Sequence, residues 1–387
     1  MPGNEVRDCA FAAVVLGAGP AGSAAAAELA RRGLPVALIG RNDQRASIGE
    51  CLPPGIRPQL EKAGVWQEFL CAGHTPSAGI CSLWGSPEPS YRDFLLSPYG
   101  KGWHIDRSGF DAMMRDSAIH FGAKWLDCLA VRHVERLASG WRIKLSVEAG
   151  DFFVDTLLVI DATGRSSVFA RRAGAKRISL DRLAGAAGYF SCRTVSSVVE
   201  PVLLVEAVEN GWWYTAPLPE GKLVAVFMTD SDFIQQEKLT QKAPWMAQLA
   251  SAVEQKQRVE GHGFQLEGAI RIVPAESSFL DRIAGDGWLA AGDAAAAFDP
   301  LSSQGIIAAV SSGLDAAQTA SAWLGGDENA PVAYAERVRK GYAEYLAHRG
   351  IYYGIEQRWP ESSFWKMRHA PSSTLAAKKE AVCVCTL

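Results

Sequence analysis

The sequence predicts an α/β protein in which a nucleotide-binding domain is interrupted by an antiparallel β-sheet domain and followed by a C-terminal helical segment. Three observations predict this class. A glycine-rich turn follows the first apolar run, and a glycine–aspartate pair follows another apolar run near residue 290. Between residues 170 and 280 the strand–helix alternation gives way to strands separated by turns.

The first unit of the chain is predicted to be a strand, a glycine turn, a helix and a second strand. The strand covers 12–17, the alanine-rich helix 21–32 and the second strand 35–39. The turn has the pattern Gly-x-Gly-x-x-Gly, in which backbone N–H groups and the positive end of the helix dipole hold a pyrophosphate. The candidate phosphate-binding residues are Gly17, Gly19, Ala21 and Gly22.

The end of the second strand departs from the usual dinucleotide pattern. A carboxylate about twenty residues after the glycine turn usually accepts the adenosine ribose hydroxyls. Here Gly40 stands in that place, followed by Arg41. We expect Arg41 to lie along the adenine or the phosphate, with Asn42 or Asp43 as substitutes for the missing acid.

Further cofactor contacts are expected from the next segments. The stretch Gly49-Glu50-Cys51-Leu52-Pro53-Pro54 precedes a helix over 56–63, and we include Glu50 among the cofactor-binding candidates. A strand over 102–107 leads into a helix over 110–120, where Arg107 can approach the pyrophosphate. Val131 begins the following strands and is a further candidate.

Two later motifs complete the site. Asp161-Ala162-Thr163-Gly164-Arg165 ends a strand in a tight turn. The carboxylate of Asp293 repels phosphate but accepts hydrogen bonds from ribityl hydroxyls, and the loop over 299–306 can pass close to a flat ring. Nucleotide at one end and sugar alcohol at the other describe FAD, so we expect a Rossmann-like FAD-binding domain of the GR2 type. The candidates in this region are Asp293, Pro300, Gly305 and Ile306.

Composition limits the other functional classes. The 387 residues carry a net charge of −3, which gives no reason to expect nucleic acid as a partner. No apolar run is long enough to cross a membrane, and the cytoplasm is the default location. The eight cysteines are scattered and no Cys/His cluster has zinc spacing, so we assign no metal site.

These patterns divide the chain into interleaved parts. The FAD-binding parts are 1–71, 101–169 and 281–330, the substrate-domain loop is 72–100, the antiparallel substrate domain is 170–280, and the C-terminal helical segment with its tail is 331–387.

Taken together, the motifs resemble the flavin-dependent monooxygenase superfamily with the para-hydroxybenzoate hydroxylase fold. The Glu50–Pro54 stretch and the loop 299–306 are similar to the branch that contains tryptophan halogenases. The stretch 211–217 resembles their Gly-Trp-x-Trp-x-Ile-Pro signature, but Tyr214 and Ala216 depart from it. Flavin halogenases also need a lysine that carries or steers hypohalous acid after the Leu-Pro-Pro helix. Residues 63–100 contain no lysine, which argues against halogenation.

A narrower resemblance covers the segments 72–86, 102–107 and 353–365, which look like flavoproteins that mature quinone-cofactor amine and amino-acid oxidases. This resemblance implies hydroxylation of a tryptophan in a partner protein, an immature quinone-cofactor subunit, through a C4a-hydroperoxyflavin. Such an enzyme uses O2 and an electron donor. No second dinucleotide motif is present, so NADH or NADPH would bind transiently, or free reduced flavin or a partner reductase would supply the electrons.

The catalytic and substrate-binding candidates follow from residue type. His104 and His74 are candidate acids, bases or hydrogen-bond donors, and the alternative is that each is a packing or surface histidine. Trp84, Trp213 and Tyr214 are candidates for an aromatic substrate pocket. Two other functions stay open: a hydroxylase or halogenase of a small aromatic metabolite, and a flavin-bound maturation chaperone that performs no oxygenation.

Overall fold

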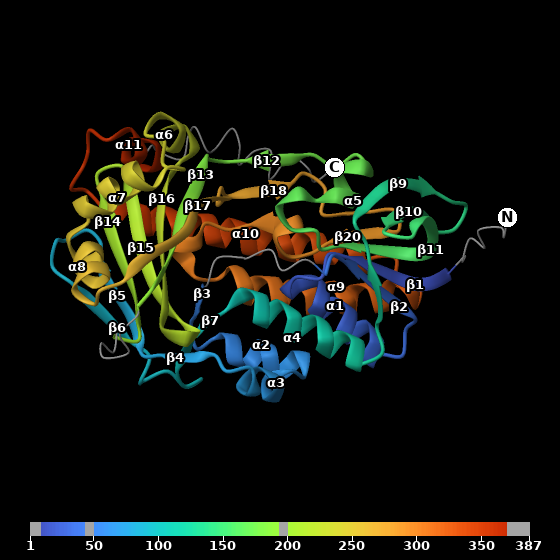
Figure 1. Ribbon diagram of the computed structural model, residues 1–387. Helices are drawn as coiled ribbons and strands as arrows, with labels where there is room; N and C mark the ends of the chain where they lie inside the picture. The colour runs from blue at the N-terminus through green and yellow to red at the C-terminus, as the bar shows by residue number, and fades with distance from the viewer. Residues whose placement is uncertain (1–8, 43–49, 193–199, 370–387) are drawn as a thin grey trace.

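The computed structural model describes residues 9–42, 50–192 and 200–369, and it places two large sheets side by side (Figure 1). The predicted α/β architecture is confirmed. One sheet carries the nucleotide-binding half of the molecule, and the other lies beside its carboxyl edge. In the part of the chain that the structure describes, no helix is long and apolar enough to cross a membrane.

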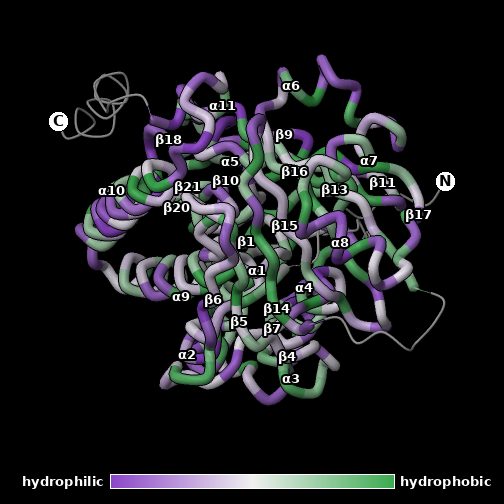
Figure 2. The backbone as a smooth tube through the Cα atoms, turned by 90° about the vertical axis from the view of Figure 1, so that its left-hand side faces the viewer, coloured by the Kyte–Doolittle hydropathy of each residue, from purple (hydrophilic) through white to green (hydrophobic). Residues whose placement is uncertain are grey.

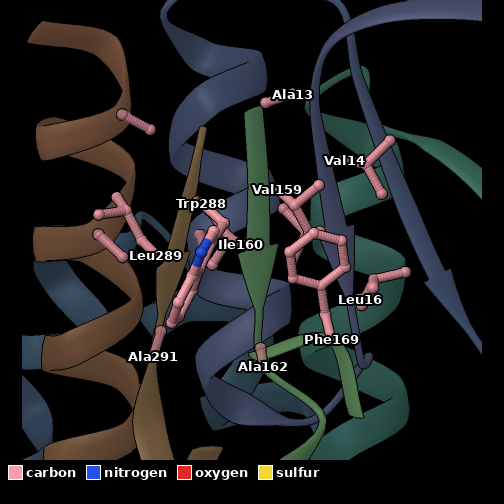
Figure 3. Packing of buried hydrophobic residues seen from close by; sticks show 14 of the residues in the cluster. Ala13, Val14, Leu16, Val159, Ile160, Ala162, Phe169, Trp288, Leu289 and Ala291 are labelled. Atoms are coloured by element: carbon pink, nitrogen blue, oxygen red, sulfur yellow. The ribbon is translucent and has the colours of Figure 1, made fainter. Parts of the chain in front are cut away.

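The eight-stranded sheet has a parallel core. Strand β1 (Cys9–Leu16) lies between β2 and β11, and its apolar side chains pack with those of β11 and β20 (Figure 3). Because parallel strands end at one edge, the turns after β1, β2, β11 and β20 meet there. The other strands are β2 (Val36–Gly40), β8 (Lys124–Asp127), β9 (Ala130–Arg136), β10 (Trp141–Val147), β11 (Gly150–Asp161), β19 (Ala284–Gly285) and β20 (Trp288–Ala290).

Helix α1 (Pro20–Arg31) lies against both α9 (Gly305–Leu324) and α4 (Arg107–His120). Its small buried side chains allow this close approach, since Ala24 to Ala27 are almost inaccessible to solvent. A Cβ added to Gly313 of α9 would lie 2.1 Å from the carbonyl oxygen of Ala21. The other helices around this domain are α2 (Ile56–Ala63), α3 (Trp66–Cys71), α5 (Val168–Arg172) and α10 (Ala330–Ile355).

The seven-stranded sheet is antiparallel except at one pairing, where β14 and β5 run parallel. Helices α6 (Ser231–Gln236), α7 (Lys242–Ser251), α8 (Val253–Gly261) and α11 (Ser363–His369) complete this half of the fold. Its strands, in spatial order, are β17 (Gln265–Pro274), β13 (Leu183–Ser191), β16 (Lys222–Asp230), β15 (Gly211–Leu218), β14 (Val202–Val208), β5 (Gly79–Leu83) and β6 (Ser90–Asp93). In Figure 2, hydrophilic residues colour much of α10, most of whose residues lie outside the core.

The segment 72–100 differs from the predicted loop. It contains β4 (Thr75–Ser77), β5 and β6, and the last two extend the seven-stranded sheet through the pairing of Gly79 with Val202. These strands are short and contain Gly, Ser and Pro, so their apolar pattern is weak. Two small sheets join the halves: β3 (Glu50–Leu52), β4 and β7 (Gly102–Ile105), and β12 (Arg177–Ser179), β18 (Ser278–Leu280) and β21 (Ala296–Ala297).

The contact between α1 and α9 can be tested by replacing Gly313 with alanine. The added methyl group would meet the Ala21 backbone, so we expect the free energy of unfolding to fall by about 1–3 kcal/mol. Gly341→Ala in α10 is the matched control, because its Cβ meets no atom within 4 Å and should raise stability by about 0.5–1 kcal/mol. Urea denaturation measures both, and equal stabilities for the two variants would contradict the close packing.

Candidate active site

A cavity of about 1350 Å³ lies between the carboxyl edge of the eight-stranded sheet and one face of the seven-stranded sheet. The lining contains nearly all the motif residues singled out from the sequence. The predicted cofactor residues that line it are Gly17, Gly19, Ala21, Arg41, Arg107, Val131, Asp293, Pro300, Gly305 and Ile306.

The glycine turn forms one end of the cavity. Gly19 immediately precedes α1, and a Cβ added there would meet no atom within 4 Å. The first turn of α1 contains no acidic residue, so its N-terminus presents N–H groups and a positive dipole to the space beside it. Gly22 has a different role, because its Cβ would lie 1.8 Å from the Gly17 carbonyl oxygen. Gly22 therefore holds α1 against the turn.

Several arginines line the same cavity as this turn. Arg107 forms an ion pair with Asp111, with Nε and Oδ1 3.2 Å apart, and both residues line the cavity. Arg115, which no sequence motif marks, also lines it and donates to Asn42 Oδ1 at 3.0 Å. Its position two helical turns after Arg107 was the available signal. The cations suit the negative charge of a pyrophosphate.

Steric constraints explain why β2 ends in glycine instead of an acidic residue. A Cβ on Gly40 would lie 2.8 Å from Ala18 Cβ and 3.0 Å from Trp125 Cη2, so a carboxylate side chain does not fit. Asp127 lies beside it on β8 and accepts a hydrogen bond from the Asn42 backbone N–H at 3.1 Å. The alternative residue Asp43 and the side chain of Glu50 lie outside the described part of the structure.

The buried carboxylate of Asp161 supports the tight turn that follows β11. Asp161 accepts hydrogen bonds from the backbone N–H groups of Phe169 and Ala170, both at 2.8 Å. It also accepts one from the Thr163 hydroxyl at 2.6 Å. Burial raises the pKa of Asp161, and these hydrogen bonds act in the opposite direction. Asp161 is thus a structural residue that shapes the cavity wall around Gly164 and Arg165.

Asp293 follows β20 and lies on the cavity wall, as predicted for a residue that accepts hydrogen bonds from the ribityl chain. Burial raises the pKa of its carboxyl group, while Arg165 lowers it from a distance of 3.7 Å. Arg177 donates to the backbone carbonyls of Asp293 and Ala294 and fixes the loop from the other side. Arg165 also donates to the Phe298 carbonyl at 3.0 Å.

The loop that follows Asp293 forms part of the cavity wall. Asp299 is 1 % exposed, and its Oδ1 accepts from the Leu301 backbone N–H at 2.9 Å. This bond caps the short helix η4 (Pro300–Ser302), after which α9 begins at Gly305. The first turn of α9 carries no acidic residue, so its positive end can stabilise negative charge beside Ile306.

The inner part of the cavity is an apolar chamber formed by the seven-stranded sheet. On β15, Trp212 and Tyr214 face the cavity. Trp213 faces the other side, where it stacks on Phe227 with ring centroids 4.8 Å apart. The sheet also contributes Leu203, Val205, Met228, Val273 and Pro274, and the same wall includes Ala275, which follows β17, and Leu301 of the loop over 299–306.

Two predicted pocket residues therefore need correction. Trp213 does not line the cavity, because successive side chains of a strand alternate between faces, and that rule pairs Tyr214 with Trp212 instead. Trp84 is also absent from the lining. Its Nε1 donates to the Tyr352 carbonyl at 2.7 Å, and its ring packs behind Trp212 at a centroid distance of 6.2 Å.

The two histidines are not brought to the cavity. His104 is fully buried in β7, and burial lowers its pKa to about 4, an effect that the nearby Pro201 backbone partly offsets. His74 packs against Phe69 with ring centroids 4.7 Å apart, and burial lowers its pKa. Both positions suit packing histidines, and neither places a ring nitrogen on the cavity wall.

The geometry fits FAD. The open space at Gly19 and the arginines suit the pyrophosphate, Asp293 suits the ribityl chain, and the loop over 299–306 borders the chamber. Fold and site together define a flavin-dependent oxidoreductase. Residues 85–382 match the family model described as tryptophan halogenase, so the chain belongs to that family. Residues 12–57 match the model described as glucose inhibited division protein A.

Individual relatives agree with this assignment. LodB of Marinomonas mediterranea, provisionally classed as an FAD-dependent oxidoreductase, is 29 % identical over 94 % of this chain and 98 % of its own. The myxobacterial chondrochloren halogenase CndH has a TM-score of 0.84 at 23 % identity and covers 97 % of this chain and 90 % of its own. The peptidyl tryptophan dihydroxylase QhpG has a TM-score of 0.77 at 22 % identity, with coverage of 94 % and 80 %. These two structures establish the fold.

Gly19→Val should separate cofactor binding from folding. Its side chain would enter open space where we place the pyrophosphate, so we expect FAD affinity to fall by about 100-fold or more, as for loss of several charge-assisted hydrogen bonds. Flavin absorbance after gel filtration measures the bound FAD. The unfolding midpoint of the apoprotein should stay unchanged, whereas Gly22→Val should lower it. Full FAD occupancy in Gly19→Val would refute the placement of the pyrophosphate at the glycine turn.

His104 should make the protein sensitive to acid. Its folded pKa of about 4 lies below the ordinary value of 6.5, so the unfolded chain binds the proton more readily. The stability that depends on a neutral His104 is fully present above pH 6.5 and is lost as the pH falls towards 4. Below both pKa values the loss in the free energy of unfolding reaches about 3 kcal/mol. Urea titrations between pH 7.5 and 4 should show a smaller decline for His104→Gln than for the wild type. Parallel declines would show that His104 is not the responsible group.

Proposed function

We propose that the chain is an FAD-dependent monooxygenase that hydroxylates a tryptophan side chain of a partner protein. The observation that carries this proposal is the chamber beside the loop over 299–306. Its wall is aromatic and apolar, with Trp212 and Tyr214 on one strand. Among the cavity-lining residues that the structure describes, none is a lysine. An electron-rich aromatic ring suits such a wall better than a charged or strongly polar substrate.

The proposed reaction inserts one atom of O2 into a ring C–H bond. The other oxygen atom leaves as water, and NADH, NADPH or reduced flavin supplies the two electrons. When bound, FAD activates the oxygen. The protein excludes water with the apolar wall and places the ring within reach. Asp293 would hold the ribityl chain, and the start of α9 at Gly305 would stabilise negative charge.

A protein substrate is supported by the relatives. QhpG is named as a peptidyl tryptophan dihydroxylase essential for tryptophylquinone cofactor biogenesis, and its fold covers 94 % of this chain. The segment 353–365, whose sequence resembles such maturation flavoproteins, lies behind the chamber and contacts it through Tyr353. We therefore propose an immature quinone-cofactor subunit as the partner.

Halogenation of an aromatic compound is the second candidate, because the family model is that of the tryptophan halogenases. A hypohalous acid that leaves the flavin needs an amine to carry or steer it. Of the charged residues on the described cavity wall, those that are positive are arginines, namely Arg41, Arg107, Arg115, Arg165 and Arg172. An arginine stays protonated and offers no nucleophilic amine at neutral pH. This chemistry favours hydroxylation.

The intact mass of the partner distinguishes these functions. Each protein encoded beside this chain would be co-expressed with the wild type, with Gly19→Val and with the control Gly341→Ala. We expect one or two added oxygen atoms on a tryptophan with the wild type and with Gly341→Ala, and none with Gly19→Val.

Other outcomes of the same experiment would contradict the proposal. A chlorine or bromine mass on any product would support halogenation. Turnover of free tryptophan or indole, with no change in any co-expressed protein, would support a small-molecule enzyme. An unmodified protein that still copurifies with both the wild type and Gly19→Val would support the chaperone alternative.

A further inference from the structure

The hydroxyl group of Tyr353 lies behind the chamber and joins two of its walls. It donates a hydrogen bond to Asp299 Oδ2 at 2.8 Å and accepts one from Trp212 Nε1 at 3.1 Å. The direction is fixed by chemistry, because an indole N–H can only donate and a carboxylate can only accept. The result is a continuous path from the substrate strand β15 through α10 to the loop that borders the flavin site.

Both partners of Tyr353 belong to the cavity. Asp299 and Trp212 are among its lining residues, whereas Tyr353 is not. Trp212 is 2 % exposed and Tyr353 is 1 % exposed, so water does not compete for these bonds. In such surroundings a hydrogen bond holds its partners more firmly than it does at the surface.

The ring of Tyr353 is itself held in place from several sides. Arg349 lies 5.0 Å and Arg368 5.4 Å from its centroid, and Trp365 packs at 6.0 Å. The two arginines are anchored in turn, Arg349 by Asp181 at 2.8 Å and Arg368 by Asp230 at 2.8 Å. The hydroxyl of Tyr353 is therefore a fixed point.

We propose that Tyr353 is a positioning residue that sets the orientation of the Trp212 indole relative to the flavin loop at Asp299. It makes no contact with substrate and acts on the substrate site through Trp212, while its hydrogen bond to Asp299 fixes the position of its hydroxyl. The inference rests on the proposed function in taking the chamber as the substrate site. A rigid indole would present one fixed surface to the ring of the substrate, and a mobile indole would not.

Tyr353→Phe removes the hydroxyl and keeps the ring. The Trp212 indole N–H then has no acceptor, and we expect its solvent exchange to quicken by about tenfold, as for loss of one buried hydrogen bond. Nitrogen-15 NMR of tryptophan indoles measures this exchange, and Trp212→Phe identifies the resonance. Tyr342→Phe is the matched control, because this tyrosine is also buried in α10 and its hydroxyl has no hydrogen-bond partner among the described residues.

Binding of indole, the probe ligand, adds a functional readout. Titration of the oxidised FAD-bound protein, followed by flavin absorbance, should give an affinity about fivefold to tenfold weaker in Tyr353→Phe. FAD affinity should change less than twofold. If Tyr353 acts through Trp212, the double variant Trp212→Phe/Tyr353→Phe should bind indole as weakly as Trp212→Phe alone.

The indole NMR signal tests the coupling between Tyr353 and Trp212, and the indole titration also tests the proposed aromatic substrate. An unchanged Trp212 indole signal in Tyr353→Phe would overturn the inference, as would fully additive losses in the double variant. An altered signal that appears equally in Tyr342→Phe would overturn it too. A changed Trp212 signal with no indole binding by the wild type would uphold the coupling and instead count against the proposed aromatic substrate.

Discussion

The close packing of the first turn of α1 is the constraint on which the rest of the site depends. A Cβ on Gly292 would lie 2.7 Å from Ala21 Cβ, and one on Gly17 would lie 2.2 Å from the Ala162 carbonyl oxygen. Gly22 and Gly313 make similarly close approaches on the other sides. Four backbone segments that are far apart in the sequence thus meet around one helical turn. Any side chain inserted between them would separate the phosphate-binding end from the residues that follow β11 and β20.

A second anchor fixes the two halves of the molecule to each other. Arg349 on α10 lies between two buried carboxylates, at 3.2 Å from Asp299 and 2.8 Å from Asp181. Asp181 lies two residues before β13 of the seven-stranded sheet, and Asp299 immediately precedes η4 in the loop on the cavity wall. A buried ion pair adds little net stability, but loss of one partner leaves an uncompensated charge. The network therefore specifies the spacing between loop and sheet more than it stabilises the fold.

The site features that could be predicted from sequence are those that a short local motif places at the end of a strand. The turn at Gly19 and the carboxylate Asp293 both lie on the cavity wall, because a short motif fixes their place at a strand end. Features that depend on distant partners were not predictable. Gly40 is explained by Ala18 of the glycine turn and Trp125 of another strand, and β5 joins its sheet by pairing with β14 and β6. Trp213 was misplaced although strand alternation alone could have corrected it.

Membership of the halogenase family and the hydroxylation that we propose are compatible, because the two chemistries make different demands on the same fold. In the halogenation alternative, an amine captures the halogenating agent that leaves the flavin, so the ring need not lie beside the flavin. Direct oxygen transfer needs no such carrier but requires the ring within contact distance and correctly oriented. The described cavity wall offers no lysine and instead presents Trp212, held through Tyr353 to the loop at Asp299. Buried hydrogen bonds hold this aromatic wall in one orientation. Direct oxygen transfer depends on the orientation of the ring, so this arrangement supports the proposed hydroxylation.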